Sequence, residues 1–138
     1  GHKTLSYLPR LIALRDAQNR QCGEALWFTP ENMLAEGCIS NVFLVKGGCL
    51  HTPPLDTPIL PGVTRAAVLE LAEENGIAVE QDLLTINNLL DAEEVFLTNA
   101  IMEIMPVTRV ERHSIGDEQP GLITRKLAEA YQRLTHSL

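Results

Sequence analysis

The chain has 138 residues, the size of one ordinary domain with a core of its own. Its net charge of -7 and pI near 5.0 argue against a nucleic-acid partner, because phosphate backbones attract a basic surface and the 11 lysines and arginines are scattered. The sequence contains no apolar run of the roughly 18 residues that a membrane span needs, and no signal-peptide pattern. We therefore expect a cytoplasmic protein.

The first half of the chain predicts one helix followed by strands. Apolar residues recur at helical spacing over residues 9–21, and Gly23 would end that helix. Residues 25–29 and 40–46 are typical of strands, and Gly47-Gly48 is a two-residue turn signal before another strand at residues 49–52. The sequence therefore predicts a β-hairpin over residues 40–52.

The second half begins with a proline-rich loop. Residues 53–61 hold four of the eight prolines, and a helix follows, closed by Gly76. Strands are predicted at residues 77–84, 95–98 and 105–110, with a short helix at 87–93 and a final helix after Pro120. The apolar stripe of the helix after the loop comprises Val63, Ala67, Val68, Leu71 and Ala72. Mixed strands and helices around one core predict an α/β or α+β fold.

Cysteines and histidines give no clear site in the sequence. The three cysteines are odd in number and too far apart for a CxxC pair, which favours reduced thiols over a disulfide framework or a thiolate metal site. The four histidines show no HxxxH or similar spacing, so we expect no metal.

Two segments could hold chemistry. The turn from Leu60 to Thr64 leads into a helix start, where free N–H groups and a partial positive charge attract anions; alternatively, Thr64 is simply the N-cap. Ala67 stands where a capping box would have Glu or Gln, and the first turn has no carboxylate. In the second segment, Glu36 precedes a hydrophobic strand and would need a cationic partner if buried; alternatively, it belongs to a surface loop.

Five segments in register resemble the class IV aminotransferases, or fold-type IV pyridoxal 5'-phosphate (PLP) enzymes. This family includes branched-chain and D-amino acid aminotransferases and 4-amino-4-deoxychorismate lyase. The resemblance implies the C-terminal domain of such enzymes, with a mixed sheet or pseudo-barrel and flanking helices. The segments are Lys3-Thr4-Leu5-Ser6-Tyr7-Leu8, Glu36-Gly37-Cys38-Ile39-Ser40-Asn41-Val42-Phe43, Thr52-Pro53-Pro54-Leu55, Leu60-Pro61-Gly62-Val63-Thr64-Arg65, and Glu94-Val95-Phe96-Leu97-Thr98-Asn99 leading to Pro106-Val107.

The resemblance also implies a role for particular residues. Lys3 would form the Schiff base with PLP and move the proton between substrate and cofactor. Glu36 would pair with the pyridine nitrogen, Leu60 would pack on the ring, and Val63 with Thr64 would form the phosphate cup. Asn99 and Ala100 match further cofactor contacts, and Tyr7 matches a residue near the phenolic oxygen of the cofactor.

Two departures from the family pattern bear on activity. Many of the aminotransferases have a hydroxyl residue at the position of Ala100; the run Thr98-Asn99-Ala100 is more similar to the aminodeoxychorismate lyases, which eliminate pyruvate. Family members also have an N-terminal domain before the cofactor lysine. We therefore expect residues 1–138 to be a single C-terminal PLP-binding domain of a two-domain, homodimeric parent acting on a small amino substrate. The activity that we expect for the parent is that of a 4-amino-4-deoxychorismate lyase. The alternatives are a branched-chain or D-amino acid aminotransferase and a domain without catalysis.

Overall fold

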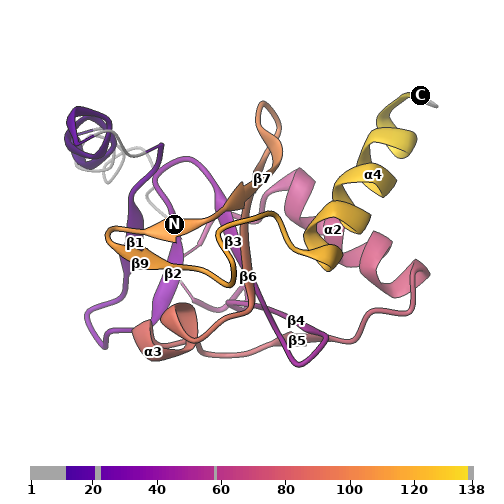
Figure 1. Ribbon diagram of the computed structural model, residues 1–138, viewed down its shortest axis with the longest axis horizontal. Coiled ribbons are helices and arrows are strands. Elements are labelled where there is room, and N and C mark those ends of the chain that lie inside the picture. Colours follow the sequence, from indigo (N-terminus) through magenta and orange to yellow (C-terminus); the bar gives the residue numbers. More distant parts are fainter. Residues whose placement is uncertain (1–11, 21–22, 58, 137–138) are drawn as a thin grey trace.

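The computed structural model describes residues 12–20, 23–57 and 59–136 (Figure 1). Residues 12–19 are helical, which agrees with the helix predicted over residues 9–21 as far as that segment is described. Two short strands, β1 (Leu26–Phe28) and β2 (Leu34–Gly37), then pair antiparallel, with an irregularity in register between Trp27 and Phe28.

A five-stranded mixed sheet forms the centre of the molecule. Its order is β5-β4-β3-β6-β7, in which β4 and β5 are parallel and the other neighbours are antiparallel. The parallel pair is joined by the proline-rich loop and helix α2, as a crossover connection requires. The strands are β3 (Asn41–Lys46), β4 (Cys49–Thr52), β5 (Val79–Gln81), β6 (Glu94–Asn99) and β7 (Glu103–Val107).

The two faces of this sheet bury separate cores. Helices α2 (Val63–Glu74) and α4 (Leu122–His136) cover one face, where Phe43 and Phe96 stack with ring centroids 4.9 Å apart among buried aliphatic side chains (Figure 1). The other face packs against β1, β2 and helix α3 (Ile86–Leu90) through Leu34, Leu44 and Leu89. No helix in the described ranges is long and apolar enough to cross a membrane.

The predicted mixed α/β architecture, with a mixed sheet and flanking helices, is confirmed. So are the hairpin of β3 and β4, the loop before α2, and the helix after Pro120. Gly76, with a φ of 69°, follows the C-cap Asn75 and ends α2 as expected.

Several boundaries and one buried position differ from the sequence predictions. The strand expected at 105–110 is interrupted at Thr108, so that β7 ends at Val107 and β8 (Arg109–Val110) pairs with β9 (His113–Ser114). The expected strand at 77–84 contracts to β5, and α3 starts at Ile86 because Thr85 forms a capping box with Asn88. Val63, expected in the apolar stripe of α2, is 85 % exposed.

Candidate cofactor site

Helix α2 begins without a side chain to satisfy its first N–H groups. The N-cap is Gly62, with extended backbone angles and no side-chain cap hydrogen bond. The first backbone bond of the helix runs from the Ala66 N–H to the Gly62 carbonyl, so the N–H groups of Val63, Thr64 and Arg65 precede the helical ladder. The interpretation of Thr64 as the N-cap is therefore wrong, and the first turn contains no acidic residue.

Helix α4, on the same face of the sheet, shows the opposite arrangement. The Glu94 carboxylate accepts the backbone N–H of Thr124 at 2.8 Å and that of Ile123 at 3.3 Å. A carboxylate at a helix start neutralises the partial positive charge there. Among the two long helices described on this face, α2 is thus the one whose start is open to an external anion.

The turn before α2 requires a glycine. A Cβ at Gly62 would overlap the side-chain oxygen of Asn41, the first residue of β3. The Asn41 amide donates to the Leu60 carbonyl at 2.8 Å, and the Gly62 N–H donates to the same carbonyl at 2.9 Å. Gly62 therefore lets the start of α2 approach the first residue of β3, Asn41, which also holds the loop in place.

Glu36 lies inside the protein and not in a surface loop. It is the third residue of β2, it is 2 % exposed, and its Oε2 accepts the Leu60 N–H at 2.8 Å. Burial of a carboxylate is costly unless hydrogen bonds or a cation compensate it. The surface-loop interpretation is therefore wrong, and the Leu60 peptide connects this carboxylate to the start of α2.

The first turn of α2 is also held from the side. Thr64 is 3 % exposed, and its hydroxyl lies 3.4 Å from the hydroxyl of Tyr131 on α4. Arg65 is 3 % exposed and donates to the Pro53 carbonyl at 3.1 Å and to Gln81 Oε1 at 3.0 Å. Burial lowers the pKa of the Arg65 guanidinium. No ion pair joins Arg65 to a carboxylate within the described ranges, so its buried positive charge adds to the potential near the helix start.

These features fit a planar cofactor with a phosphate at one end and a basic ring nitrogen at the other. The helix start offers N–H donors and a hydroxyl to a phosphate, and Glu36 offers a carboxylate to a protonated nitrogen. Leu60, 53 % exposed, and Val63 present apolar surface beside these polar groups. Lys3 and Tyr7, the other residues expected at the cofactor, lie outside the described residues.

Comparison with known proteins decides the family. The family model described as amino-transferase class IV matches residues 1–110. The chain belongs to the class IV aminotransferases. The cofactor of this family is PLP, as the sequence resemblance implied.

Curated relatives carry different activities at similar identity. The chain is 38% identical over 130 residues to a putative branched-chain-amino-acid aminotransferase of Methanocaldococcus jannaschii, covering 94% of this chain and 45% of that protein. It is also 38% identical over 131 residues to the aminodeoxychorismate lyase of Bacillus subtilis, covering 95% of this chain and 44% of that protein. The chain thus spans less than half the length of these relatives.

Solved structures of the family share the fold closely. The Escherichia coli branched-chain amino acid aminotransferase superimposes with a TM-score of 0.90 at 34% identity, over 93% of this chain and 43% of that chain. The PLP-form of the Thermobaculum terrenum branched-chain aminotransferase gives a TM-score of 0.90 at 34% identity, over 95% and 43% of the two chains.

The class IV resemblance also named Asn99 and Ala100 as cofactor contacts. The Asn99 side chain closes the turn after β6, because its oxygen accepts the N–H groups of Ile101 and Met102 and its amide donates to the Ile39 carbonyl. Ala100 is exposed in the same turn and has no hydroxyl to offer. A contact from this turn to a phosphate would therefore use backbone N–H groups.

Sequence reasoning gave no role to three residues that shape the candidate site: Asn41, Arg65 and Tyr131. Asn41, Gly62 and Arg65 lay within segments that the resemblance singled out, but the contact between Gly62 and Asn41 was not foreseen. The Tyr131 contact joins two helices 67 positions apart, and nothing in the local sequence signals it.

Proposed function

We propose that the chain is the C-terminal, PLP-binding domain of a two-domain enzyme that acts on a small amino substrate. The proposal depends above all on one arrangement: the Leu60 peptide holds the buried Glu36 carboxylate next to a helix start that has no capping side chain. Family membership supplies the identity of the cofactor. The remaining length of the relatives would supply the other walls of the site, because this chain spans only part of them.

Each proposed site residue would serve a separate part of the cofactor. The N–H groups of Val63 and Thr64, with the Thr64 hydroxyl, would bind the phosphate, and Leu60 would pack against the ring. Asn99 and Ala100 would face the phosphate through their backbone. Glu36 would keep the ring nitrogen protonated, since a buried carboxylate favours the charged form of a cationic partner.

Lys3 would hold the cofactor covalently through its ε-amino group and, once freed by the substrate amine, move a proton at the substrate carbon. The bound cofactor supplies an electron sink for the pair of electrons left on that carbon. Tyr7 would approach the phenolic oxygen.

For the reaction itself we propose elimination of pyruvate from 4-amino-4-deoxychorismate, which leaves 4-aminobenzoate. The feature that favours it is the run Thr98-Asn99-Ala100, which lacks the hydroxyl residue that many aminotransferases have at position 100. The alternative is amino transfer on branched-chain or D-amino acids, supported by the many relatives with those names, including a D-alanine aminotransferase of Bacillus licheniformis at 37% identity.

Further proposals concern the state of the protein. The parent would be a cytoplasmic homodimer, and residues 1–138 alone would be weakly active or inactive because part of the substrate pocket is missing. A domain without catalysis is the second alternative. It has no physical need for a buried carboxylate beside an open helix start, which is why we place it last.

The first experiment tests the cofactor lysine. The protein is mixed with PLP, the visible spectrum is recorded, and borohydride reduction followed by peptide mass spectrometry locates the adduct. A stoichiometric adduct on Lys3 that is absent from Lys3→Ala is the expected result. An adduct spread over several lysines, in both residues 1–138 and the full-length parent, would contradict the proposal.

The second experiment separates the reactions and uses the full-length parent. Release of pyruvate and 4-aminobenzoate from 4-amino-4-deoxychorismate is expected. Amino transfer to 2-oxoglutarate from branched-chain or D-amino acids, without pyruvate release, would replace the lyase proposal with the alternative. Absence of both activities in a protein that carries the Lys3 adduct would favour the non-catalytic domain.

A further inference from the structure

A cluster of ligand-type side chains lies at the edge of the central sheet, away from the cofactor site. Cys49 and His51 are two residues apart on β4, so both point to the same face of the sheet. Their neighbours across β3 are Lys46 and Leu44, and Leu44 belongs to the core on the side of α3. Cys49 and His51 therefore lie on the face opposite α2 and α4.

The neighbouring strand adds carboxylates to this cluster. Glu80 on β5 is the direct parallel partner of His51, and Asp82 follows β5 by one residue. His51 Nδ1 lies 3.2 Å from Asp82 Oδ1 and 3.8 Å from Glu80 Oε2. One ligand atom each from Cys49, His51 and Glu80 lie within 4.8 Å of one another.

These separations are close to those of a metal site. Tetrahedral Zn²⁺ has Zn–S bonds of about 2.3 Å and Zn–N or Zn–O bonds of about 2.0–2.2 Å, which places its ligand atoms roughly 3.3–3.6 Å apart. Cys49 and His51 are half-buried and Glu80 is exposed, so rotation of these side chains, without movement of either strand, would bring the three atoms to that spacing. Thiolate, imidazole and carboxylate together are the donor set that proteins use for zinc.

A histidine–carboxylate ion pair explains only part of this arrangement. It accounts for His51 between Glu80 and Asp82, but the thiol of Cys49, which donates to the Leu50 carbonyl at 3.7 Å, takes no part in it. A divalent cation would account for all of these side chains together, because thiolate, imidazole and carboxylate groups are all ligands of such ions.

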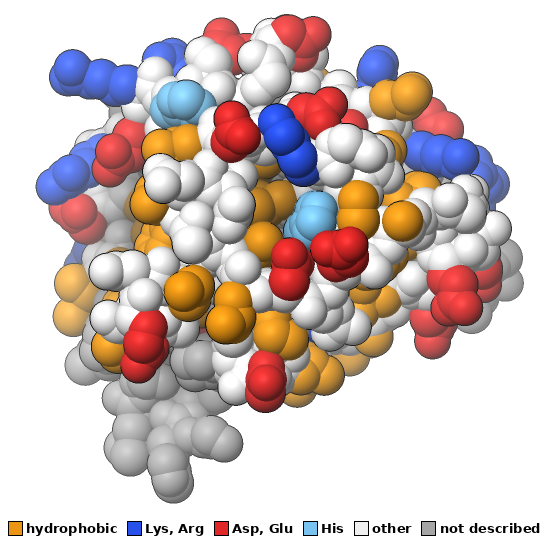
Figure 2. All heavy atoms as spheres, turned by 90° about the horizontal axis from the view of Figure 1, so that it is seen from below, with side chains coloured by type: hydrophobic (Ala, Val, Ile, Leu, Met, Phe, Trp, Pro, Cys, Tyr) orange, Lys and Arg blue, Asp and Glu red, His pale blue; other side chains and the backbone are white. Residues whose placement is uncertain are grey.

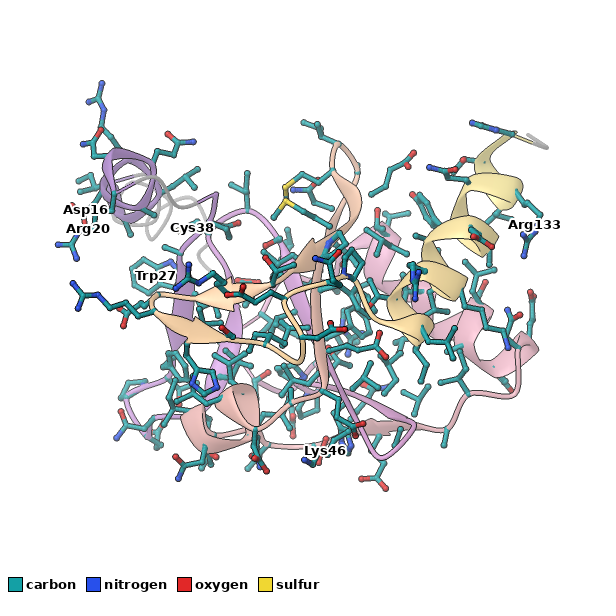
Figure 3. The ribbon with its side chains drawn as sticks, in the orientation of Figure 1. Asp16, Arg20, Trp27, Cys38, Lys46 and Arg133 are labelled. Carbon is teal, nitrogen blue, oxygen red and sulfur yellow. The ribbon has the colours of Figure 1, made fainter. Side chains whose placement is uncertain are left out.

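The cluster is accessible from solvent. His51 and Asp82 line a hollow of about 140 Å³ together with residues of α3 and its C-terminal end. Figure 2, seen from below Figure 1, shows a histidine beside two acidic side chains around the centre of this face. Lys46, labelled in Figure 3, also lines the hollow, but its ammonium pairs with Asp91 at 3.5 Å and is thereby partly neutralised.

We propose that Cys49, His51 and Glu80 bind a divalent transition-metal ion of the Zn²⁺ class, which fastens the edge strand β5 to β4. A ring nitrogen of His51 would bind the Zn²⁺ ion, and Asp82, whose Oδ1 lies 3.2 Å from His51 Nδ1, would remain beside it as an additional carboxylate. The site is separate from the proposed PLP site. Cys49 pairs with Lys46, the last residue of β3, whereas Asn41, which holds the Leu60 carbonyl, is the first residue of that strand. Cys49 and His51 are two positions apart, but Glu80 follows much later in the chain, so the spacing of cysteines and of histidines predicted no metal.

The test is a Zn²⁺ titration of the purified protein after treatment with a chelator, followed by calorimetry. Saturable binding of one Zn²⁺ per chain is expected. Cys49→Ser, His51→Gln and Glu80→Gln are each expected to weaken it at least about tenfold. His136→Gln at the end of α4 and Glu70→Gln on α2, both exposed and on the other face of the sheet, serve as matched controls and are expected to keep the wild-type affinity.

Two further readouts separate ligand loss from misfolding. Co²⁺ is expected to give a thiolate-to-metal absorption band in the wild type that Cys49→Ser lacks. Zn²⁺ is also expected to raise the Tm of the wild type and of the controls, but not of ligand variants whose metal-free Tm is unchanged. Absence of saturable Zn²⁺ binding, or equal affinity in the wild type and all three ligand variants, would overturn the proposal.

Discussion

Thr124 donates both its backbone N–H and its hydroxyl to the same oxygen of Glu94, Oε1, at 2.8 and 2.7 Å. This contact places a fixed negative charge at the start of α4, while the start of α2 on the same face has none. The two helices therefore differ in whether a carboxylate already occupies the helix start. Substitutions at the start of each helix can test the consequences of this difference.

Removal of the fixed charge should destabilise α4. Glu94→Ala is expected to lower the free energy of unfolding by about 2 kcal/mol, because three donors at the helix start lose their acceptor. Glu94→Gln keeps an acceptor without the charge and should cost less. Urea unfolding followed by circular dichroism measures both, and unchanged midpoints would show that the contact contributes little.

The start of α2 should be sensitive to a single methyl group. In Gly62→Ala the new Cβ would overlap Asn41, forcing the loop away from β3, so PLP affinity should fall by at least about tenfold. Gly23→Ala is the matched control, because a Cβ there meets no atom of the described residues within 4 Å. PLP titration followed by absorbance compares the two, and equal affinities would show that the start of α2 does not hold the phosphate.

The hydroxyl of Thr64 should contribute directly to phosphate binding. Thr64→Val removes it at nearly constant volume and is expected to weaken PLP by about tenfold, whereas Thr64→Ser should stay near the wild type. Tyr131→Phe removes the hydroxyl 3.4 Å away and should have a smaller effect, since it only orients Thr64. If Thr64→Val and Thr64→Ser bind PLP equally well, the hydroxyl makes no contact with the phosphate.

Glu36 should matter more for turnover than for cofactor binding. Glu36→Gln can still accept the Leu60 N–H but carries no charge, so kcat of the full-length parent should fall by about 100-fold with the fold retained. Glu70→Gln, exposed on α2, is the control. Steady-state kinetics and the spectrum of bound PLP provide the test; a kcat within a factor of two of the wild type would remove Glu36 from the proposed mechanism.

The thiol of Cys38 should react slowly. Burial, assisted by Glu24, raises its pKa against the opposing effect of the Trp27 N–H, which lies 3.1 Å from the sulfur (Figure 3). A raised pKa lowers the thiolate fraction at a given pH, so alkylation by iodoacetamide should still accelerate above about pH 9. Peptide mass spectrometry measures the rate, with the protein in urea as the control. Equal rates in the folded and unfolded protein would contradict this prediction.

Patterns local in sequence predicted much of the fold. The Gly47-Gly48 turn sets the hairpin of β3 and β4, and the prolines before residue 62 fix where α2 starts. Strand β2 was missed, because Leu34–Gly37 is short and contains a glutamate. Its burial depends on packing against β1 and against the core that contains Leu44 and Leu89. A local pattern does not encode such long-range contacts.

Only those parts of the candidate site that depend on local sequence could be predicted. The open helix start could be inferred from the absence of acidic residues after Gly62, and this part of the interpretation is confirmed. The N-cap itself depends on the backbone angles of Gly62, so that Thr64 is the second residue of the helix and not its N-cap. The roles of Lys3 and of the other cofactor residues stay predictions.

The Leu60 peptide serves both ends of the proposed cofactor site. Its N–H is bound to Glu36, and its carbonyl accepts Asn41 and the Gly62 N–H. The N–H belongs to the planar amide that joins Ile59 to Leu60, and the carbonyl belongs to the planar amide that joins Leu60 to Pro61. Both amides are held by hydrogen bonds, so Leu60 connects the group that would meet the ring nitrogen to the helix start that would meet the phosphate. The backbone of Leu60 would thus fix the distance between the two ends of the cofactor. We expect the protein to bind a PLP analogue with a changed ring substituent more tightly than an analogue lengthened by one methylene between ring and phosphate.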